Sequence, residues 1–444
     1  MSSELLDTAD KLLRRLRSSY DELVVMVNGV DSVMVKIVNN DVVLKYSRKS
    51  YDVELYLVKG KRILILESST SDLNQLIRSV DDISRYVHIV EESDLYAPLP
   101  EPKPVKSLGN LVDSTVVKYM SEPTRLCEVL INSAVNEGAE RVSGILSLGM
   151  RSKALVSSNG FEGFEVGSEV STYLRVFKGD HSGHWAYGGR FLDLKSIEDV
   201  GRTATQYASY AKDFIDIPPG RYDVILSPLV VGNLMELVVS MTSAFNVLAG
   251  FSMFMSKSLG DVVATDKLTL ADVPRDIELS NSTSFDDEGV ETYDKELISR
   301  GSLKTLLHNS KTAKKFNTVS TGNAGWIVPK PWNIAVAPGD SDVDEMVREV
   351  RNGLLISNNW YTRLQNYVEG LFSTVSRDDV LVIRNGEVVG SVRRVRIADN
   401  LSRLLSNIWL IGSKPYLIRW WEVEVPSKVP YILVKDLNIT KPFE

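Results

Sequence analysis

Three consecutive carboxylates, Asp286, Asp287 and Glu288, form an acidic group that could do chemistry. Carboxylate oxygens bind Mg²⁺ or Ca²⁺, and they also bind the positively charged amino terminus of a peptide. Gly289 supports a second interpretation, a turn before a hairpin. In such a turn an Asp side chain accepts hydrogen bonds from backbone N–H groups and the glycine takes a positive φ. We favour the turn, but the sequence leaves both interpretations open.

The chain has four histidines, and one pair has a spacing that metal sites use. His181 and His184 are three residues apart, so they could ligate one metal ion together. They lie beside Gly179 and Gly183 between two predicted strands, which favours a surface loop instead. The single cysteine, Cys127, lies in an apolar helical pattern and is expected to be a buried, inert thiol. No serine or cysteine has a histidine placed to activate it as a nucleophile.

A strand followed by a helix is predicted in the middle of the chain. The apolar residues 222–226 predict a buried strand, residues 227–229 a turn, and residues 231–248 a helix. On a helical wheel Met241 lies on the apolar face and is predicted to be a core residue, whereas Glu236 lies on the other face. Glu236 therefore either points into a cleft or is a solvated carboxylate.

The stretch GNLMELVVSM, residues 232–241, resembles the strand–helix unit of the TldD/PmbA family of peptidases. Other motifs of that family are matched in the same order along the chain. They lie at residues 285–289, 298–303, 312–316, 320–325, 370–373, 385–388 and 397–401. Each motif alone is weak, since Asn-Gly and Gly-Asn are ordinary turn dipeptides, but their joint order and spacing are specific. The resemblance covers roughly residues 130–440.

The resemblance implies a peptidase scaffold without its metal centre. Metal-binding members of the family carry HExxxH at this point, and here Glu236, Leu237 and Met241 replace the three functional residues. Leucine cannot act as a general base, and methionine is a poor ligand for Zn²⁺. The family's third zinc ligand is a cysteine near the C-terminus, where this chain has none. We therefore expect no metal or other cofactor in this chain and zinc in a partner subunit.

The family resemblance implies a subunit that helps to form a chamber for short or unfolded peptides. The expected partner is a TldD-like paralogue with HExxxH, in a heterodimer, and this chain is expected to be inactive alone. The residues predicted to contact substrate are Glu236, Asp286, Asp287, Glu288, Asn323 and Phe372. Two alternatives stay open. One is a homodimeric enzyme that rebuilds a carboxylate metal site, and the other is a peptide-binding or scaffold protein without catalysis.

The order of the predicted elements indicates an α+β fold, with antiparallel sheets flanked by helices. Two domains are expected, residues 1–218 and 219–444, and the first contains a stiff, proline-rich connector at residues 97–106. Helices are predicted at residues 4–20, at 71–87, near 121–137, at 196–215 and near 341–353. Strands are predicted at residues 24–38, 42–45, 53–58 and 62–66, then near 142–149, 152–156 and 168–178.

Charge and hydrophobicity exclude two classes of protein. The net charge of −7 gives no electrostatic support for binding nucleic acid. No run approaches 18 apolar residues, so no membrane span is expected. The amphipathic start of the chain differs from a signal peptide, and a cytoplasmic location is expected.

Overall fold

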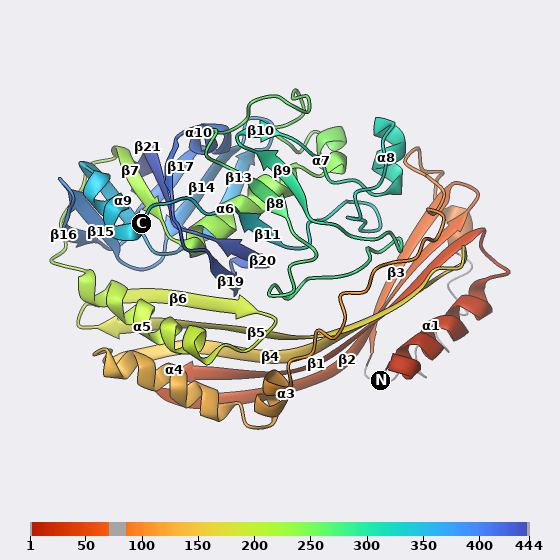
Figure 1. The fold of residues 1–444 in the computed structure, drawn as a ribbon, viewed down its shortest axis with the longest axis horizontal. Coiled ribbons are helices and arrows are strands. Elements are labelled where there is room, and N and C mark those ends of the chain that lie inside the picture. Colours follow the sequence, from red (N-terminus) through yellow and green to blue (C-terminus); the bar gives the residue numbers. More distant parts are fainter. Residues whose placement is uncertain (1, 71–85, 442–444) are drawn as a thin grey trace.

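The structure is a computed structural model that describes residues 2–70 and 86–441. Six antiparallel strands form its base (Figure 1). We call them sheet 1, and their order across the sheet is β3-β2-β1-β4-β5-β6. Their bounds are β1 Glu22–Val38, β2 Asp41–Lys59, β3 Arg62–Thr70, β4 Arg141–Ser157, β5 Glu162–Lys178 and β6 His181–Gly189. Short turns join β1 to β2, β2 to β3, β4 to β5 and β5 to β6, and at the first of them Asn39 and Asn40 take positive φ angles of 52° and 67°. These angles suit the hairpin turn that the right-handed twist of strands requires.

Helices cover one face of sheet 1. The amphipathic helix α1 (Ser2–Leu16) packs Leu5, Leu12 and neighbouring apolar residues onto one end of β1, β2 and β4. The helices α3 (Ser114–Ser121), α4 (Thr124–Asn136) and α5 (Leu194–Tyr210) cover the other end. Because side chains alternate along a strand, the residues of β1 between those that face the helices point to the opposite side. That opposite face meets the C-terminal half of the chain (Figure 1).

Two further sheets build the C-terminal half. Sheet 2 has the order β10-β9-β8-β11-β20-β19, and sheet 3 has the order β13-β14-β17-β21-β7-β12-β15-β16 with β18 beside β21. Sheet 2 comprises β8 Leu270–Asp272, β9 Lys295–Ser299, β10 Ser302–Leu303, β11 Ile334–Val336, β19 Tyr416–Trp420 and β20 Val423–Val429. Sheet 3 comprises β7 Gly220–Leu226, β12 Asn352–Ile356, β13 Asn359–Asn366, β14 Leu371–Ser376, β15 Val380–Arg384, β16 Glu387–Val392, β17 Arg396–Asn400, β18 Ile408–Ile411 and β21 Ile432–Thr440. The parallel pairs among the described strands are β11–β20 and β7–β12.

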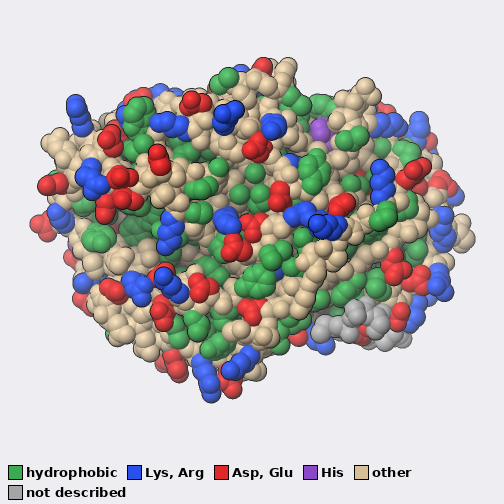
Figure 2. Space-filling view, viewed as in Figure 1, with side chains coloured by type: hydrophobic (Ala, Val, Ile, Leu, Met, Phe, Trp, Pro, Cys, Tyr) green, Lys and Arg blue, Asp and Glu red, His purple; other side chains and the backbone are tan. Residues whose placement is uncertain are grey.

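Short helices lie around these sheets, and β19 joins the two halves by packing against β6 and β5. The helices are α6 (Pro228–Met241), α7 (Ala244–Ala249), α8 (Ser310–Phe316), α9 (Val343–Glu349) and α10 (Leu401–Ser406), and a 3-10 turn, η2, spans Val87–Ile89. The predicted α+β class, with antiparallel sheets flanked by helices, is confirmed. No helix of the described residues is long and apolar enough to cross a membrane. On the face that Figure 2 shows, charged side chains of both signs are interspersed.

Several predicted boundaries differ from those of the structure. The helix predicted near 121–137 is confirmed as α4, and the shorter helix α3, which ends before Pro123, was not predicted. The predicted strands 142–149 and 152–156 are one strand, β4, because pairing with β1 and β5 continues through Gly149 to Ser152. Helix α5 ends at Tyr210 rather than at Ile215. The helix predicted at 71–87 falls mostly on residues 71–85, which lie outside the described part of the chain.

The helix predicted at residues 231–248 is also wrong, because it is two helices that meet at Thr242 and Ser243. Helix α6 starts earlier, at Pro228, since the Ser227 hydroxyl accepts a hydrogen bond from the N–H of Leu229 and caps its first turn. At the break, the backbone around Ser243 pairs with Leu307 as an isolated β-bridge. This pairing uses N–H and C=O groups that a continuous helix would need.

We predict that Cys127 in the native protein resists thiol reagents. Its side chain is fully buried on α4, and burial raises the pKa of the thiol to about 12, so the reactive thiolate is scarce. Ellman's reagent should label Cys127 at least about 100-fold faster in the urea-unfolded chain than in native buffer. Rapid, stoichiometric labelling of the native protein would contradict this packing of α4.

Candidate functional site

Asp286 organises the turn that the acidic group was predicted to form. Its Oδ1 accepts hydrogen bonds from the N–H groups of Glu288 and Val290, both at 2.9 Å, and its Oδ2 accepts one from Ala324, also at 2.9 Å. Gly289 has a φ of +79°, and a Cβ at this position would lie 2.6 Å from the Phe161 ring. The predicted capping turn is thus confirmed in its geometry. Burial, together with the charge of Glu288, raises the pKa of Asp286.

Asp287 and Asn323 bind the loop that carries Lys330. The Asp287 Oδ2 lies 2.6 Å from Lys330 Nζ, and the Asn323 side chain donates a hydrogen bond to the carbonyl of Lys330 at 2.9 Å. Asn323 also donates to Asp272 Oδ2 at 2.6 Å and accepts from Lys295 Nζ at 3.0 Å. All the polar atoms of the Asn323 side chain are therefore used within the protein.

Glu288 forms an ion pair with Lys311 that is buried on both sides. The Glu288 Oε1 lies 2.8 Å from Lys311 Nζ, and both side chains are 1% exposed. The N–H of Ser310 donates to Glu288 Oε2, so the carboxylate also caps the start of α8. The Lys311 Nζ lies 4.4 Å from the ring centre of Tyr56 on β2, and that ring stacks on Trp326. Burial lowers the pKa of Lys311, but the charge of Glu288 outweighs this effect and raises the pKa above its ordinary value.

The structure therefore brings four of the six predicted site residues, Asp286, Asp287, Glu288 and Asn323, into one buried network. Their side chains are at most 3% exposed, and each has a partner within the protein. Among residues 2–70 and 86–441, no group of three or more His, Cys, Asp or Glu side chains is arranged to hold a metal ion. In this structure the network links sheet 1 to the loops of the C-terminal half.

Glu236 lies outside this network, on α6 beside β20. Its Oε2 accepts hydrogen bonds from the backbone N–H groups of Glu424 at 3.0 Å and Val425 at 3.4 Å. Burial raises the pKa of Glu236 to about 7. The interpretation of Glu236 as a solvated carboxylate is wrong, because the side chain is partly buried and binds two backbone N–H groups of β20.

The residues at the family's zinc positions do not form a donor set for zinc. Met241 is 1% exposed and packs in the main core, as predicted, and Leu237 packs against the same core. The remaining oxygen donor, Glu236, is engaged by β20. A thioether in the core and a single carboxylate do not match the Cys, His and carboxylate sets that bind Zn²⁺.

Phe372, the sixth predicted site residue, is 2% exposed and belongs to the main core through β14. Its predicted contact with substrate stays a prediction, and it would require the ring to leave that core.

The prediction of a surface loop for His181 and His184 is wrong. Both lie on β6, and residues three apart on a strand point to opposite faces, so the pair cannot ligate one ion. His181 Nδ1 lies 2.6 Å from Asp379 Oδ2. His184 is fully buried between the rings of Tyr173 and Trp420, at 5.4 and 4.6 Å between ring centres. Burial lowers the pKa of His184 to about 3, so the ring is neutral at physiological pH.

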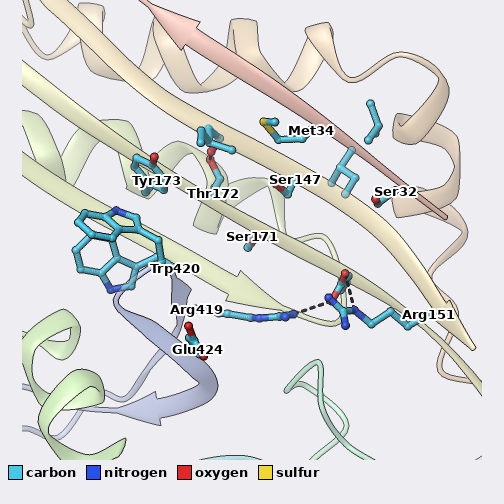
Figure 3. Close-up of a pocket in the computed structure, with 15 residues that line it drawn as sticks. Ser32, Met34, Ser147, Arg151, Ser171, Thr172, Tyr173, Arg419, Trp420 and Glu424 are labelled. Atoms are coloured by element: carbon cyan, nitrogen blue, oxygen red, sulfur yellow. Dashed lines mark hydrogen bonds and ion pairs between the residues drawn. The ribbon is translucent and has the colours of Figure 1, made fainter. Parts of the chain in front are cut away.

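A cavity of about 650 Å³ lies between sheet 1 and the β19–β20 hairpin (Figure 3). Its volume is in the range of small-molecule sites. The lining residues come from β1, β4 and β5 on one side and from residues 419–424 on the other. The lining also includes Glu424, whose backbone N–H binds Glu236, so α6 supports the wall of the cavity through β20.

Motif analysis missed the charged residues of this cavity. Arg151 lies on β4, Glu169 on β5 and Arg419 on β19, and the three meet through Glu169. Each is an ordinary polar residue in an alternating strand, and none lies within a family motif. The alternation of polar residues along β4 and β5 was the available signal, because it marks a strand face that the helices leave uncovered.

Comparison with known proteins identifies the family to which the chain belongs. A family model described as PmbA/TldA metallopeptidase C-terminal domain matches residues 219–441, and one described as PmbA/TldA metallopeptidase central domain matches residues 118–210. A metalloprotease from Methanothermobacter thermautotrophicus is 26% identical over 324 residues, which cover 68% of this chain and 70% of that protein. Metalloprotease PmbA from Escherichia coli O157:H7 is 27% identical over 53% of this chain and 51% of its own length, about half of each. TldE from Thermococcus kodakarensis shares the fold, with a TM-score of 0.86 at 18% identity over 98% of this chain and 100% of that chain.

We predict that Lys311→Met destabilises the protein by about 3–5 kcal/mol, because it leaves the buried Glu288 carboxylate without its counter-charge. Urea unfolding measures this loss. Lys315→Met, an exposed lysine on the same helix, is the matched control and should change the free energy of unfolding by less than about 0.5 kcal/mol. The double variant with Glu288→Gln should recover part of the loss. Equal stabilities of the Lys311 and Lys315 variants would show that the pair is not buried as described.

We also predict that Glu236 makes the protein less stable as the pH rises. Since the pKa is about 7 in the folded chain and 4.5 is its ordinary value, the folded state holds the proton more tightly, and this stabilisation is lost between about pH 4.5 and 7. Glu236→Gln keeps an oxygen for the Glu424 N–H and should remove a decline of the order of 1–3 kcal/mol from the pH profile.

The measurement is urea unfolding across this pH range, with the exposed Glu349→Gln as a control. A wild-type profile parallel to that of Glu236→Gln would mean that the carboxylate is solvated after all.

Proposed function

Because the chain belongs to the PmbA/TldD metallopeptidase family, we propose that it is the non-metal-binding subunit of a two-subunit peptidase. In this proposal a paralogue with HExxxH binds zinc and hydrolyses the amide bond, and this chain forms part of the wall of the chamber that holds the peptide. The single observation that carries the proposal is the state of the family's zinc positions. Met241 is a core residue and Glu236 Oε2 is bonded to β20, which supports the expectation that zinc is bound by the partner.

The internal bonding of the acidic network supports a structural role for it within this proposal. Asp286, Asp287, Glu288 and Asn323 would keep the chamber wall in shape, because their hydrogen bonds and ion pairs join loops of the C-terminal half to one another. Lys311, the partner of Glu288, in turn packs on the ring of Tyr56 in sheet 1. Direct contact with peptide would fall to residues that line open space. The cavity in Figure 3 offers such residues from both halves of the chain.

The experiment is co-expression of this chain, carrying an affinity tag, with an untagged HExxxH relative from the same genome. We expect the two chains to co-purify in equal amounts with about one zinc ion per heterodimer, measured by mass spectrometry of the metal, and no stoichiometric zinc in the isolated chain. The tagged chain expressed alone is the control for adventitious metal.

Two results would overturn the proposal. Failure of the chains to associate at micromolar concentration would remove the heterodimer. Stoichiometric metal in the isolated chain would instead favour a homodimeric enzyme with a carboxylate-rich site.

A further inference from the structure

One end of the cavity in Figure 3 carries an excess of positive charge. Arg151 Nε lies 2.9 Å from Glu169 Oε1, and Arg419 Nη1 lies 2.6 Å from Glu169 Oε2, so two guanidinium groups share one carboxylate. Burial raises the pKa of Glu169, but the charges of Arg419 and Arg151 outweigh this effect and hold the pKa below its ordinary value. The carboxylate is therefore charged, and this end keeps one net positive charge.

The two guanidinium groups have donors left over. Arg419 Nη1 makes one further hydrogen bond, to Ser280 Oγ at 3.0 Å. Within the described part of the chain, Arg151 Nη1 and Nη2 and Arg419 Nη2 have no hydrogen-bond partner. Planar guanidinium forks of this kind match the geometry of a carboxylate, and such charge-assisted hydrogen bonds are the strong ones.

The floor of the cavity beside this charged end is made of small residues. Ser147 pairs with Ser171, and Gly149 pairs with Glu169, across β4 and β5. A Cβ at Gly149 would lie 3.3 Å from Glu169 Oε1, so the glycine leaves room for the carboxylate between the arginines. An extended chain can therefore lie along β5 without meeting large side chains.

The other end of the cavity is aromatic. Tyr173 follows Glu169 by four residues on β5, so it lies on the same face about 13 Å away. Trp420 and Trp421 complete this end, with their rings edge to face at 5.2 Å. Trp421 is 44% exposed, and although Arg377 lies 5.0 Å from its ring centre, part of the ring stays open to a ligand. About four residues of an extended peptide span this distance.

We propose that this cavity binds the carboxyl-terminal end of a short peptide, with its carboxylate on Arg151 and Arg419 and its preceding side chains against Tyr173, Trp420 and Trp421. The carboxylate of Glu424, which also lines the cavity, suits the positive amino terminus of the same peptide. The claim that the ligand is a peptide rests on the proposed function. The binding itself needs only this chain, so the two proposals can fail separately.

The test is calorimetric titration of the isolated chain with Phe-Ala-Gly-Gly, whose aromatic residue lies four positions from the carboxylate end, and with its C-terminal amide. We expect the free acid to bind at least about tenfold more tightly than the amide, because the amide loses the charge-assisted pair. Arg419→Met should weaken binding of the acid by about tenfold and remove the difference between acid and amide. Arg125→Met, an exposed arginine on α4, is the matched control and should bind both peptides as the wild type does.

The comparison of acid with amide on the wild-type chain decides the matter even if Arg419→Met does not fold. Equal binding of the two peptides, or no binding of either at millimolar concentration, would overturn the proposal. Tighter binding of inorganic phosphate than of the peptide acid would also overturn it, since it would assign the arginines to a phosphate group. None of these results bears on association with a HExxxH relative.

Discussion

The structure depends on one constraint. Both faces of sheet 1 must be covered, but the helices cover only one of them. Helices α1, α3, α4 and α5 bury the first face with aliphatic and aromatic side chains. The second face is wide, because strands of 17 and 19 residues expose many side chains. The C-terminal half covers that face, in part with aromatic contacts around Trp326 and in part with loops that carry charge. The cavity lies where this cover leaves space between β5 and β19.

Buried ion pairs and hydrogen bonds stabilise the loops of the C-terminal half, and this explains why the residues of the acidic motif bind other groups of the protein. A buried carboxylate is costly unless a counter-charge and hydrogen bonds compensate it. Glu288 has Lys311 and the start of α8, and Asp287 has Lys330. The same residues that suggest cation binding in the sequence thus form ion pairs that connect loops of the protein. At α6, the position of family zinc ligands is likewise used for packing and for holding β20.

Features of the fold and the site could be predicted from the sequence when they depend on residues close together in the chain, but not when they depend on residues far apart in it. Local patterns predicted the α+β class, the burial of Met241 and Cys127, and the turn at Asp286, because apolar periodicity and turn chemistry depend on near neighbours. The break at Ser243 could not be predicted, since it depends on a bridge to Leu307, 64 residues away in the chain. The burial of His184 and the meeting of Arg151, Glu169 and Arg419 likewise depend on how β5, β6 and β19 come together. Polar residues with no motif around them carry no local signal of such a meeting.

The central claim is that this chain supports catalysis without performing it, and matched glutamate variants in the co-purified complex test it most directly. One variant is Glu236→Gln in this chain, and the other is the glutamate of HExxxH to glutamine in the partner. The measurement is the rate of hydrolysis of a short fluorogenic peptide. The account predicts that the partner's variant abolishes hydrolysis and that Glu236→Gln leaves most of the rate. Loss of hydrolysis with Glu236→Gln, in a complex that still forms and binds zinc, would contradict it.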